Sequence, residues 1–207
     1  MDEKLLYKAF GVDAEYLIDH SWGREPTTIA EIKAYKSKNN SLSSGQVLFR
    51  EYNYEEGLLI VKEMVDLLCL DLVDKGLVTD SIFLYVGYSR DTAKSSHGTS
   101  PLTVTTNSVR VITKAFSLLY EKIVNKTAPI RRVNIGFNNV VDEAYEQYDL
   151  FTDPAELEKD RKIQMAVLDI KKKFGKNAIM KGMNLEDAAT TRERNLQIGG
   201  HKSGESD

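Results

Sequence analysis

Apolar and polar residues alternate with a period of two in four separate stretches of the chain, and each stretch predicts a β-strand. In the first stretch we expect Val47 and Phe49 on one face and Gln46 and Leu48 on the other. Each predicted strand therefore has one apolar and one largely polar face. The four stretches are Ser41 to Phe49, Ile82 to Ser89, Leu102 to Thr105, and Arg132 to Asn138.

Two stretches between these strands carry apolar residues at helical spacing and predict amphipathic helices. Asn53 and Glu56 have the spacing of a capping box, and Gly76 is expected to end the helix that follows. The second helix is expected to begin at Asn107 or Ser108. The apolar stripes are Leu58, Val61, Val65, Leu68 and Leu72 in the first helix, and Ile112, Phe116, Leu119 and Ile123 in the second.

The resulting order of strand, helix, strand, strand, helix, strand predicts an α+β fold. We expect a four-stranded, mostly antiparallel sheet with two helices on one face. The other face stays open, and we expect it to be polar, somewhat basic and poor in carboxylates, which suits contact with phosphates. This open face is expected to present Ser44, Gln46, Thr103, Thr105, Arg132, Asn134 and Asn138.

The predicted sheet is flanked by a short helical piece at the N-terminus and by a tail. Met1 stands almost directly on an apolar-periodic stretch, so we expect the intact polypeptide to begin further upstream. In the tail, Pro154 is expected at the first position of a helix that ends at Gly175. The stretch from Thr190 to Asp207 is polar and contains glycine, and we expect a mobile end there.

Charge is distributed unevenly along the chain, although the net charge is only −3. Residues 49–80 hold three basic and eight acidic residues, whereas residues 90–132 hold eight basic and two acidic ones. A folded domain with this distribution can offer one cationic face. Two solvated helices of opposite charge would give the same counts, so both interpretations stay open here.

Other features narrow the class of protein. The single cysteine, Cys69, lies in an apolar helical stretch, which favours a packing role and the reducing cytosol. No apolar run approaches the roughly 20 residues of a membrane helix, so we expect no membrane partner. His97 has no strand-turn-helix setting that would indicate a hydrolase, and no histidine cluster suggests a metal site.

Six segments of the chain form a recognisable set. They are FGVDAEYLIDHSWGREP (Phe10 to Pro26), SLSSGQVL (Ser41 to Leu48), IRRVNIGF (Ile130 to Phe137), QYDLF (Gln147 to Phe151), KKKFGKNAI (Lys171 to Ile179) and TTRERNLQIGGHK (Thr190 to Lys202). In their order and spacing they resemble Y-family DNA polymerases of the ImpB/MucB/SamB type, the bacterial polymerase V branch. The first segment is similar to the end of their thumb region. The second resembles the first strand of their little-finger domain, and the third resembles its last strand, where paired arginines occur. The fourth is similar to their sliding-clamp-binding peptide, and the last two, in the tail, resemble the same branch.

The resemblance implies a domain organisation and a function. Residues 1–36 would be the end of the thumb, residues 37–142 the little-finger DNA-binding domain, and residues 143–207 a tail with the clamp-binding peptide. The intact protein would be an error-prone translesion polymerase of the SOS response, cytoplasmic and nucleoid-associated. Its partners would be primer-template DNA, the sliding clamp and accessory SOS proteins.

Catalysis is expected elsewhere in such a protein. The family's palm and fingers hold the metal-binding carboxylates, so the resemblance implies Mg²⁺ in the palm and no cofactor or metal in this chain. Phosphoryl transfer needs two divalent ions held between such groups, and no predicted strand here presents a convergent carboxylate pair. We therefore expect this part of the protein not to be an enzyme by itself.

The expected contacts fall into two sets. Gly136 and Asn138 stand where some relatives carry a further basic residue, so the phosphate contact is expected at Arg131 and, because the alternation turns it outward, mainly at Arg132. Tyr148 replaces the leucine common at the second position of the clamp peptide. The DNA-binding set is Ser41, Ser43, Ser44, Gln46, Arg90, Lys94, Thr103, Thr105, Arg131, Arg132 and Asn134. The clamp-binding set is Gln147, Tyr148, Asp149, Leu150 and Phe151.

Two other classes share the predicted strand order. RNA-recognition modules stack bases on aromatic residues of their central strands, but here the third strand, LTVTT, lacks such residues. A ferredoxin-like ligand-sensing domain would need a specific pocket, and the sequence shows none. Salt-sensitive binding to naked primer-template DNA would separate the polymerase part from both alternatives.

Overall fold

The structure of the chain is a computed structural model that describes residues 3–35, 40–90, 92–145, 154–198 and 201–202. It contains two compact units, Met1–Asn39 and Asn40–Asp207. The first unit consists of α1 (Glu3–Phe10), the 3₁₀ helix η1 (Gly11–Asp13), α2 (Ala14–Ser21) and α3 (Ile29–Ala34). Of its described residues only Ala14 is buried, and large side chains such as Trp22 are exposed.

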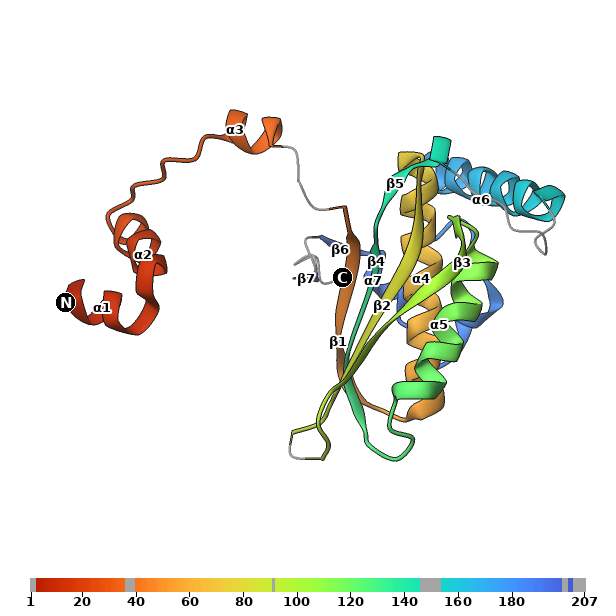
Figure 1. The fold of residues 1–207 in the computed structure, drawn as a ribbon, viewed down its shortest axis with the longest axis horizontal. Helices are drawn as coiled ribbons and strands as arrows, with labels where there is room; N and C mark the ends of the chain where they lie inside the picture. Colours follow the sequence, from red (N-terminus) through yellow and green to blue (C-terminus); the bar gives the residue numbers. More distant parts are fainter. Residues whose placement is uncertain (1–2, 36–39, 91, 146–153, 199–200, 203–207) are drawn as a thin grey trace. The chain divides into compact units, whose positions relative to one another are not determined.

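The second unit has the predicted α+β fold. Its main elements are β1 (Leu42–Tyr52), α4 (Tyr54–Lys75), β2 (Leu77–Tyr88), β3 (Ser96–Thr106), α5 (Val109–Ile123) and β4 (Ile130–Asn138). The strands pair in the order β1-β4-β2-β3, and all pairs are antiparallel (Figure 1). A two-residue strand, β5 (Val141–Asp142), adds to the start of β2. The predicted sheet with two helices behind it is confirmed.

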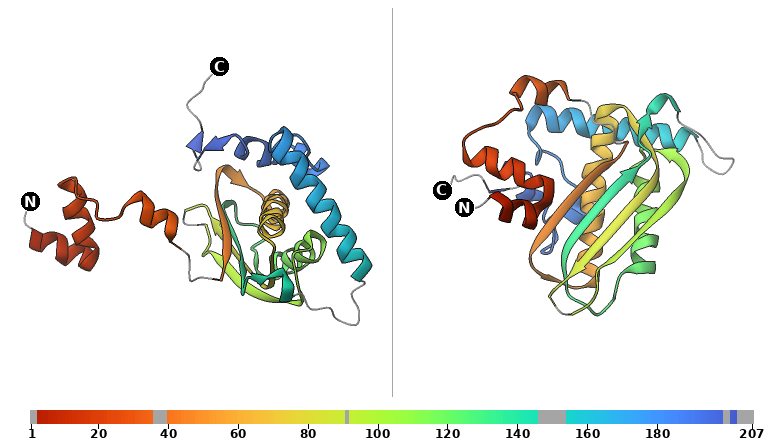
Figure 2. Two further views of the ribbon diagram at one scale, coloured as in Figure 1. Left: turned by 90° about the horizontal axis from the view of Figure 1, so that it is seen from above. Right: turned by 60° about the vertical axis from the view of Figure 1, so that its left-hand side comes forward.

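The helices α4 and α5 cover the same face of the sheet, and the core lies between the helix layer and the sheet (Figure 2). Alternate residues of β2 and β4 point into this core because side chains of a strand alternate between its faces. Tilted aromatic rings join the layers: the Phe116 centroid on α5 lies 6.2 Å from that of Phe137 on β4. The buried strand residues include Leu48, Ile82, Leu84, Val86, Val133, Ile135 and Phe137.

Local signals in the sequence set the helix ends. At the start of α4 the Glu56 N–H donates to Asn53 Oδ1 and the Asn53 N–H to Glu56 Oε2, both at 2.9 Å, so the predicted capping box is confirmed. Gly76 ends the helix in the left-handed region, with φ of 63°. The second helix begins after Ser108 as predicted, but the Ser108 hydroxyl donates to Asp160 Oδ2 instead of capping α5.

The tail packs on the helix-covered side of the sheet. The helix α6 (Pro154–Phe174) begins and ends where predicted and lies against α4. The 3₁₀ helix η2 (Glu143–Tyr145) precedes α6 in the chain. After α6 come the 3₁₀ helix η3 (Gly182–Leu185), α7 (Thr191–Arg194), and the paired strands β6 (Gln197–Ile198) and β7 (His201–Lys202). No described helix is long and apolar enough to cross a membrane.

The prediction of a mobile end from Thr190 onward is wrong for residues 190–198. Thr190 and Thr191 are buried, and the carboxylate of Glu63, a buried residue of α4, accepts hydrogen bonds from their backbone N–H groups at 2.7 and 3.4 Å. This polar stretch is ordered because its donors satisfy a buried acidic side chain, which the local composition does not reveal.

Candidate nucleic-acid interface

The open face of the sheet is built from rows of side chains that the strand register places next to one another. Directly paired residues of antiparallel strands point to the same face. From the edge strand inward, the three central rows are Ser43, Gly136, Phe83 and Thr99; Gly45, Asn134, Tyr85 and His97; and Val47, Arg132 and Gly87. None of these positions carries a carboxylate, so the only formal charge in the rows is that of Arg132.

Glycines keep this face shallow. A Cβ atom on Gly45 would lie 2.4 Å from Asn134 Oδ1, so the Asn134 side chain can lie across β1 only because residue 45 is glycine. A Cβ atom on Gly87 would lie 3.2 Å from the Arg132 Cβ and 3.4 Å from Tyr85 Cε1. At both positions a neighbouring side chain of the open face uses the room that the missing Cβ atom leaves.

The paired arginines occupy different places. Arg132 is exposed on the open face, between Val47 of β1 and Gly87 of β2. Arg131 is half-buried at a β-bulge, because Gly87 and Tyr88, consecutive in β2, pair with Arg132 and Ile130. The bulge returns Ile130 to the core and leaves Arg131 as the extra residue, so the greater weight given to Arg132 agrees with its position.

The prediction of which β1 side chains lie on the open face is wrong. Leu48 is buried, whereas Val47 and Phe49 are 67% and 68% exposed on the opposite side. Gln46 points to the helix-covered side, where its Nε2 donates to Thr190 Oγ1 at 2.9 Å and its Oε1 accepts from Arg194 at 3.0 Å. Ser44 is on that side too. Because residues 47–49 are all apolar, they do not show by themselves which alternate residues of β1 face the core. The apolar residues at even positions, Leu42, Leu48 and Tyr52, were the signal that indicated the correct inner face.

The remaining predicted residues lie on or beside the open face. Thr103 and Thr105 alternate with Leu102 and Val104 on β3, and Asn134 is in the middle row. Ser43 is exposed on β1, and Ser41 is exposed just before that strand. Arg90 and Lys94 are exposed in the connection between β2 and β3, beyond the row that contains Arg132.

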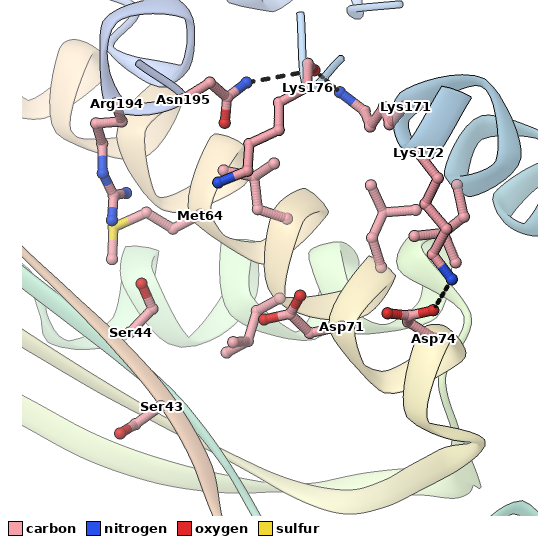
Figure 3. A pocket seen from close by; sticks show the side chains of 14 residues that line it. Ser43, Ser44, Met64, Asp71, Asp74, Lys171, Lys172, Lys176, Arg194 and Asn195 are labelled. Atoms are coloured by element: carbon pink, nitrogen blue, oxygen red, sulfur yellow. Dashed lines mark hydrogen bonds and ion pairs between the residues drawn. The ribbon is translucent and has the colours of Figure 1, made fainter. Parts of the chain in front are cut away.

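A separate pocket of about 470 Å³ lies on the helix-covered side, between β1, α4, α6 and α7. Ser43 and Ser44 leave β1 on opposite sides, and Ser44 points toward Met64 and Arg194 (Figure 3). Lys172 forms an ion pair with Asp74 there, and burial raises the pKa of Asp71. Ser44 therefore belongs to this pocket and not to the open face.

The clamp-binding residues Gln147 to Phe151 lie outside the described residues. Within the described part of the chain, no group of three or more His, Cys, Asp or Glu side chains could hold a metal ion.

Comparison with protein families gives a match over more than half of the chain. The model of the impB/mucB/samB family C-terminal domain matches residues 39–150. These residues include β1 to β4, the helices behind them and the open face.

Curated relatives match over almost the entire chain. The chain is 27% identical over 203 residues to the "Putative UV-damage repair protein UvrX" of Bacillus subtilis (strain 168), covering 97% of the chain and 47% of the relative. It is 25% identical over 196 residues to DNA polymerase IV 2 of Halalkalibacterium halodurans, covering 93% of the chain and 46% of the relative. The chain thus spans about half the length of these relatives.

Solved structures that match the chain include a Y-family DNA polymerase chimera of Dbh and Dpo4, with a TM-score of 0.38 and 15% identity. A post-insertion binary complex of Dbh DNA polymerase gives a TM-score of 0.36 and 12% identity. Each match covers 68% of this chain and 39% of the other.

Proposed function

The chain belongs to the impB/mucB/samB family as a C-terminal part of a Y-family DNA polymerase, and from this premise we propose that its open sheet face holds primer-template DNA by the phosphates during lesion bypass. In this proposal residues 1–36 are the end of the thumb, residues 37–142 the little finger, and residues 143–207 the tail. Docking on the sliding clamp, accessory SOS partners and a cytoplasmic, nucleoid-associated location belong to the same proposal.

The observation that carries the proposal is the composition of the open face. Its central rows hold one exposed arginine, several neutral hydrogen-bonding side chains, the half-buried aromatic residues Phe83 and Tyr85, and no carboxylate, although the whole chain has a net charge of −3. Phosphates attract cations and accept hydrogen bonds from neutral donors, and such contacts position DNA without reading its sequence. We expect contacts from Ser41, Ser43, Arg90, Lys94, Thr103, Thr105, Arg131, Arg132 and Asn134.

The alternatives receive less support. RNA-recognition modules stack bases on aromatic residues of their central strands; here the central strand β2 carries Phe83 and Tyr85 on the open side, but its central neighbour β4 carries Gly136, Asn134 and Arg132 there. The pocket of about 470 Å³ lies away from the open face, on the helix-covered side. It is lined mainly by leucines and by charged residues, of which Lys172 and Asp74 pair with each other. The family match favours DNA over both an RNA ligand and a sensed small molecule.

A salt titration of DNA binding tests the proposal. The 207-residue chain should bind primer-template DNA weakly and with little sequence preference. Replacing Arg131 and Arg132 together by alanine should weaken binding to every sequence and reduce the salt slope by about one unit for each phosphate that the variant no longer binds. Lys114→Ala, an exposed change on α5 behind the sheet, is the matched control. Equal binding by the double variant and the parent would exclude this face.

Catalysis is assigned to the rest of the parent protein. We propose that the palm, upstream of this chain, supplies the Mg²⁺-binding carboxylates, so the 207-residue chain with magnesium, primer-template and nucleotides should extend nothing. Extension that follows the chain through several purification steps, with contaminating polymerase excluded, would contradict this assignment.

A further inference from the structure

Besides Phe83 and Tyr85 of β2, the open face carries two apolar side chains at its rim. Val47 and Phe49 lie on β1, the edge strand of the sheet, and about two thirds of each side chain is exposed. Leu48 between them is buried, so the exposure follows from the alternation of the strand and not from local disorder. Phosphate contacts do not account for exposed valine and phenylalanine, because an anion gains nothing from apolar surface.

Basic side chains lie near Val47 and Phe49, together with the exposed carboxylate of Glu51, which accepts a hydrogen bond from Ser89 Oγ at 2.6 Å. Val47 is paired with Arg132, and that row is the one nearest the connection between β2 and β3, which carries Arg90 and Lys94. Figure 1 shows this connection at the end of the sheet where β4 begins. A nucleic-acid strand that reaches Val47 and Phe49 therefore has positive charge beside it for its phosphates.

Phe49 is held in place by its neighbours. Its ring meets the ring of buried Tyr52 edge to face, with centroids 5.8 Å apart and planes at 87°. Arg50 lies 4.1 Å from the Tyr52 ring centroid and forms an ion pair with Glu56 at 2.7 Å, which fixes this end of β1. A ring positioned in advance gives up little conformational freedom on binding a flat ligand.

We propose that Phe49, with Val47 beside it, stacks on an unpaired base of the single strand that leaves the duplex held at Arg132. In a duplex both flat surfaces of a base are covered by its neighbours, whereas an unpaired base can stack on an aromatic side chain whatever its identity. The edge position of β1 suits a strand that departs from the duplex at the rim of the face. This inference rests on the proposed function and adds a preference for DNA with a single-stranded extension.

The test compares two DNAs with the same duplex, one blunt and one with a single-stranded extension, bound to the 207-residue chain. The parent should bind the extended DNA about tenfold more tightly, the effect of stacking one base. Phe49→Ser should abolish this difference and leave the affinity for blunt DNA unchanged, whereas Phe49→Trp should keep it. Leu118→Ser, which removes a similarly exposed apolar side chain from α5, should change neither affinity.

Arg132→Gln separates the inference from the proposed function. If this variant binds both DNAs as tightly as the parent, the proposed function fails. If it weakens both equally while Phe49→Ser keeps the preference for the extension, only the stacking inference fails. A Phe49→Ser effect on self-association in sedimentation, with the preference retained, would show that a second copy covers this patch and would also overturn the inference. Val47→Thr tests the same contact if Phe49→Ser does not fold.

Discussion

The Glu63 carboxylate accepts a hydrogen bond of 2.7 Å from the backbone N–H of Thr190, which lies 127 residues further along the chain. The same side chain accepts from Asn184 Nδ2 at 2.7 Å, and only 1% of Glu63 is exposed to solvent. A buried carboxylate requires such donors, because its charge is costly to bury without them. This network attaches the tail to α4 and, through the contact of Thr190 with Gln46, to β1.

Glu63→Gln should therefore destabilise the folded chain. The amide retains one acceptor oxygen but places an N–H₂ group against the N–H donors of the tail, and buried polar groups left without partners cost roughly 1–3 kcal/mol each. Urea unfolding followed by circular dichroism measures the decrease in stability. Glu121→Gln, an exposed change on α5, is the control. Equal unfolding midpoints for the two variants would show that the network contributes nothing.

Most elements of the fold could be predicted because their signals are local. The capping residues Asn53 and Glu56 mark the start of α4, and Pro154 marks the start of α6. The alternation in β4 indicated the correct inner face because only one phase is apolar there, and in β2 the aliphatic residues Ile82, Leu84 and Val86 marked the inner face. Family resemblance then supplied the identity of the domain, which the family match confirmed.

The sequence predictions failed where contacts between residues far apart in the sequence determine which side chains are buried. Gln46 is polar, yet it faces the helices because Thr190 and Arg194 supply its hydrogen-bond partners. The tail is polar, yet part of it is buried because Glu63 accepts from its backbone. Neither relationship appears in the periodicity of one segment, since each needs two segments that are more than a hundred residues apart in the sequence.

The lysines at the end of α6 should differ in their effect on stability. Lys171 Nζ donates to the carbonyls of Lys176 at 2.6 Å and Ile179 at 2.9 Å, whereas the exposed Lys173 lies over the Phe174 ring at 5.2 Å. Lys171→Met should lower the free energy of unfolding by roughly 1 kcal/mol, and Lys173→Met should leave it nearly unchanged. Urea unfolding of the two variants makes the comparison.

Neither lysine variant should change DNA affinity, because α6 lies behind the sheet against α4. To find out whether the tail contacts DNA, single substitutions are better than removal of all residues after Thr152. Such a truncation would also remove the hydrogen-bond partners of Glu63 and Gln46, so a loss of stability could not be distinguished from a loss of DNA binding. A decrease in DNA affinity in Lys173→Met, with stability intact, would indicate a second DNA contact in the tail.

Acid should weaken the attachment of α6. The hydrogen bonds from Arg161, of which that from Nη2 is 2.7 Å, lower the pKa of Glu143, against an opposing effect of burial. A carboxyl group with a lowered pKa contributes stability that is complete above its ordinary value of 4.5 and is lost as pH falls through the pKa of the folded state.

Glu143→Gln should therefore lower the urea midpoint at pH 7, and the difference from the parent should shrink as the pH is taken below about 4.5. Glu158→Gln serves as the comparison, because the exposed ion pair of Glu158 with Lys162 is screened by solvent and should contribute little. A difference between parent and Glu143→Gln that stays constant from pH 7 to about pH 3 would contradict this role of Glu143.

The peptide from Gln147 to Phe151 should bind the bacterial sliding clamp. It lies in the sequence between η2 and Pro154, the first residue of α6, and the family resemblance expects a clamp-binding peptide at this place. An extended peptide can insert Leu150 and Phe151 together into an apolar pocket while Gln147 forms a hydrogen bond at its edge, and such anchors carry most of the energy of a small interface. We expect micromolar affinity, on the order of −7 to −8 kcal/mol.

The test is a titration of purified clamp with the parent and with Leu150→Ala/Phe151→Ala. Leu185→Ala/Leu196→Ala removes two other exposed leucines of the tail and controls for nonspecific apolar binding. The prediction requires that only the first variant fails to bind; if Leu150 and Phe151 instead pack on the chain itself, that variant will be less stable, and the parent will not bind the clamp.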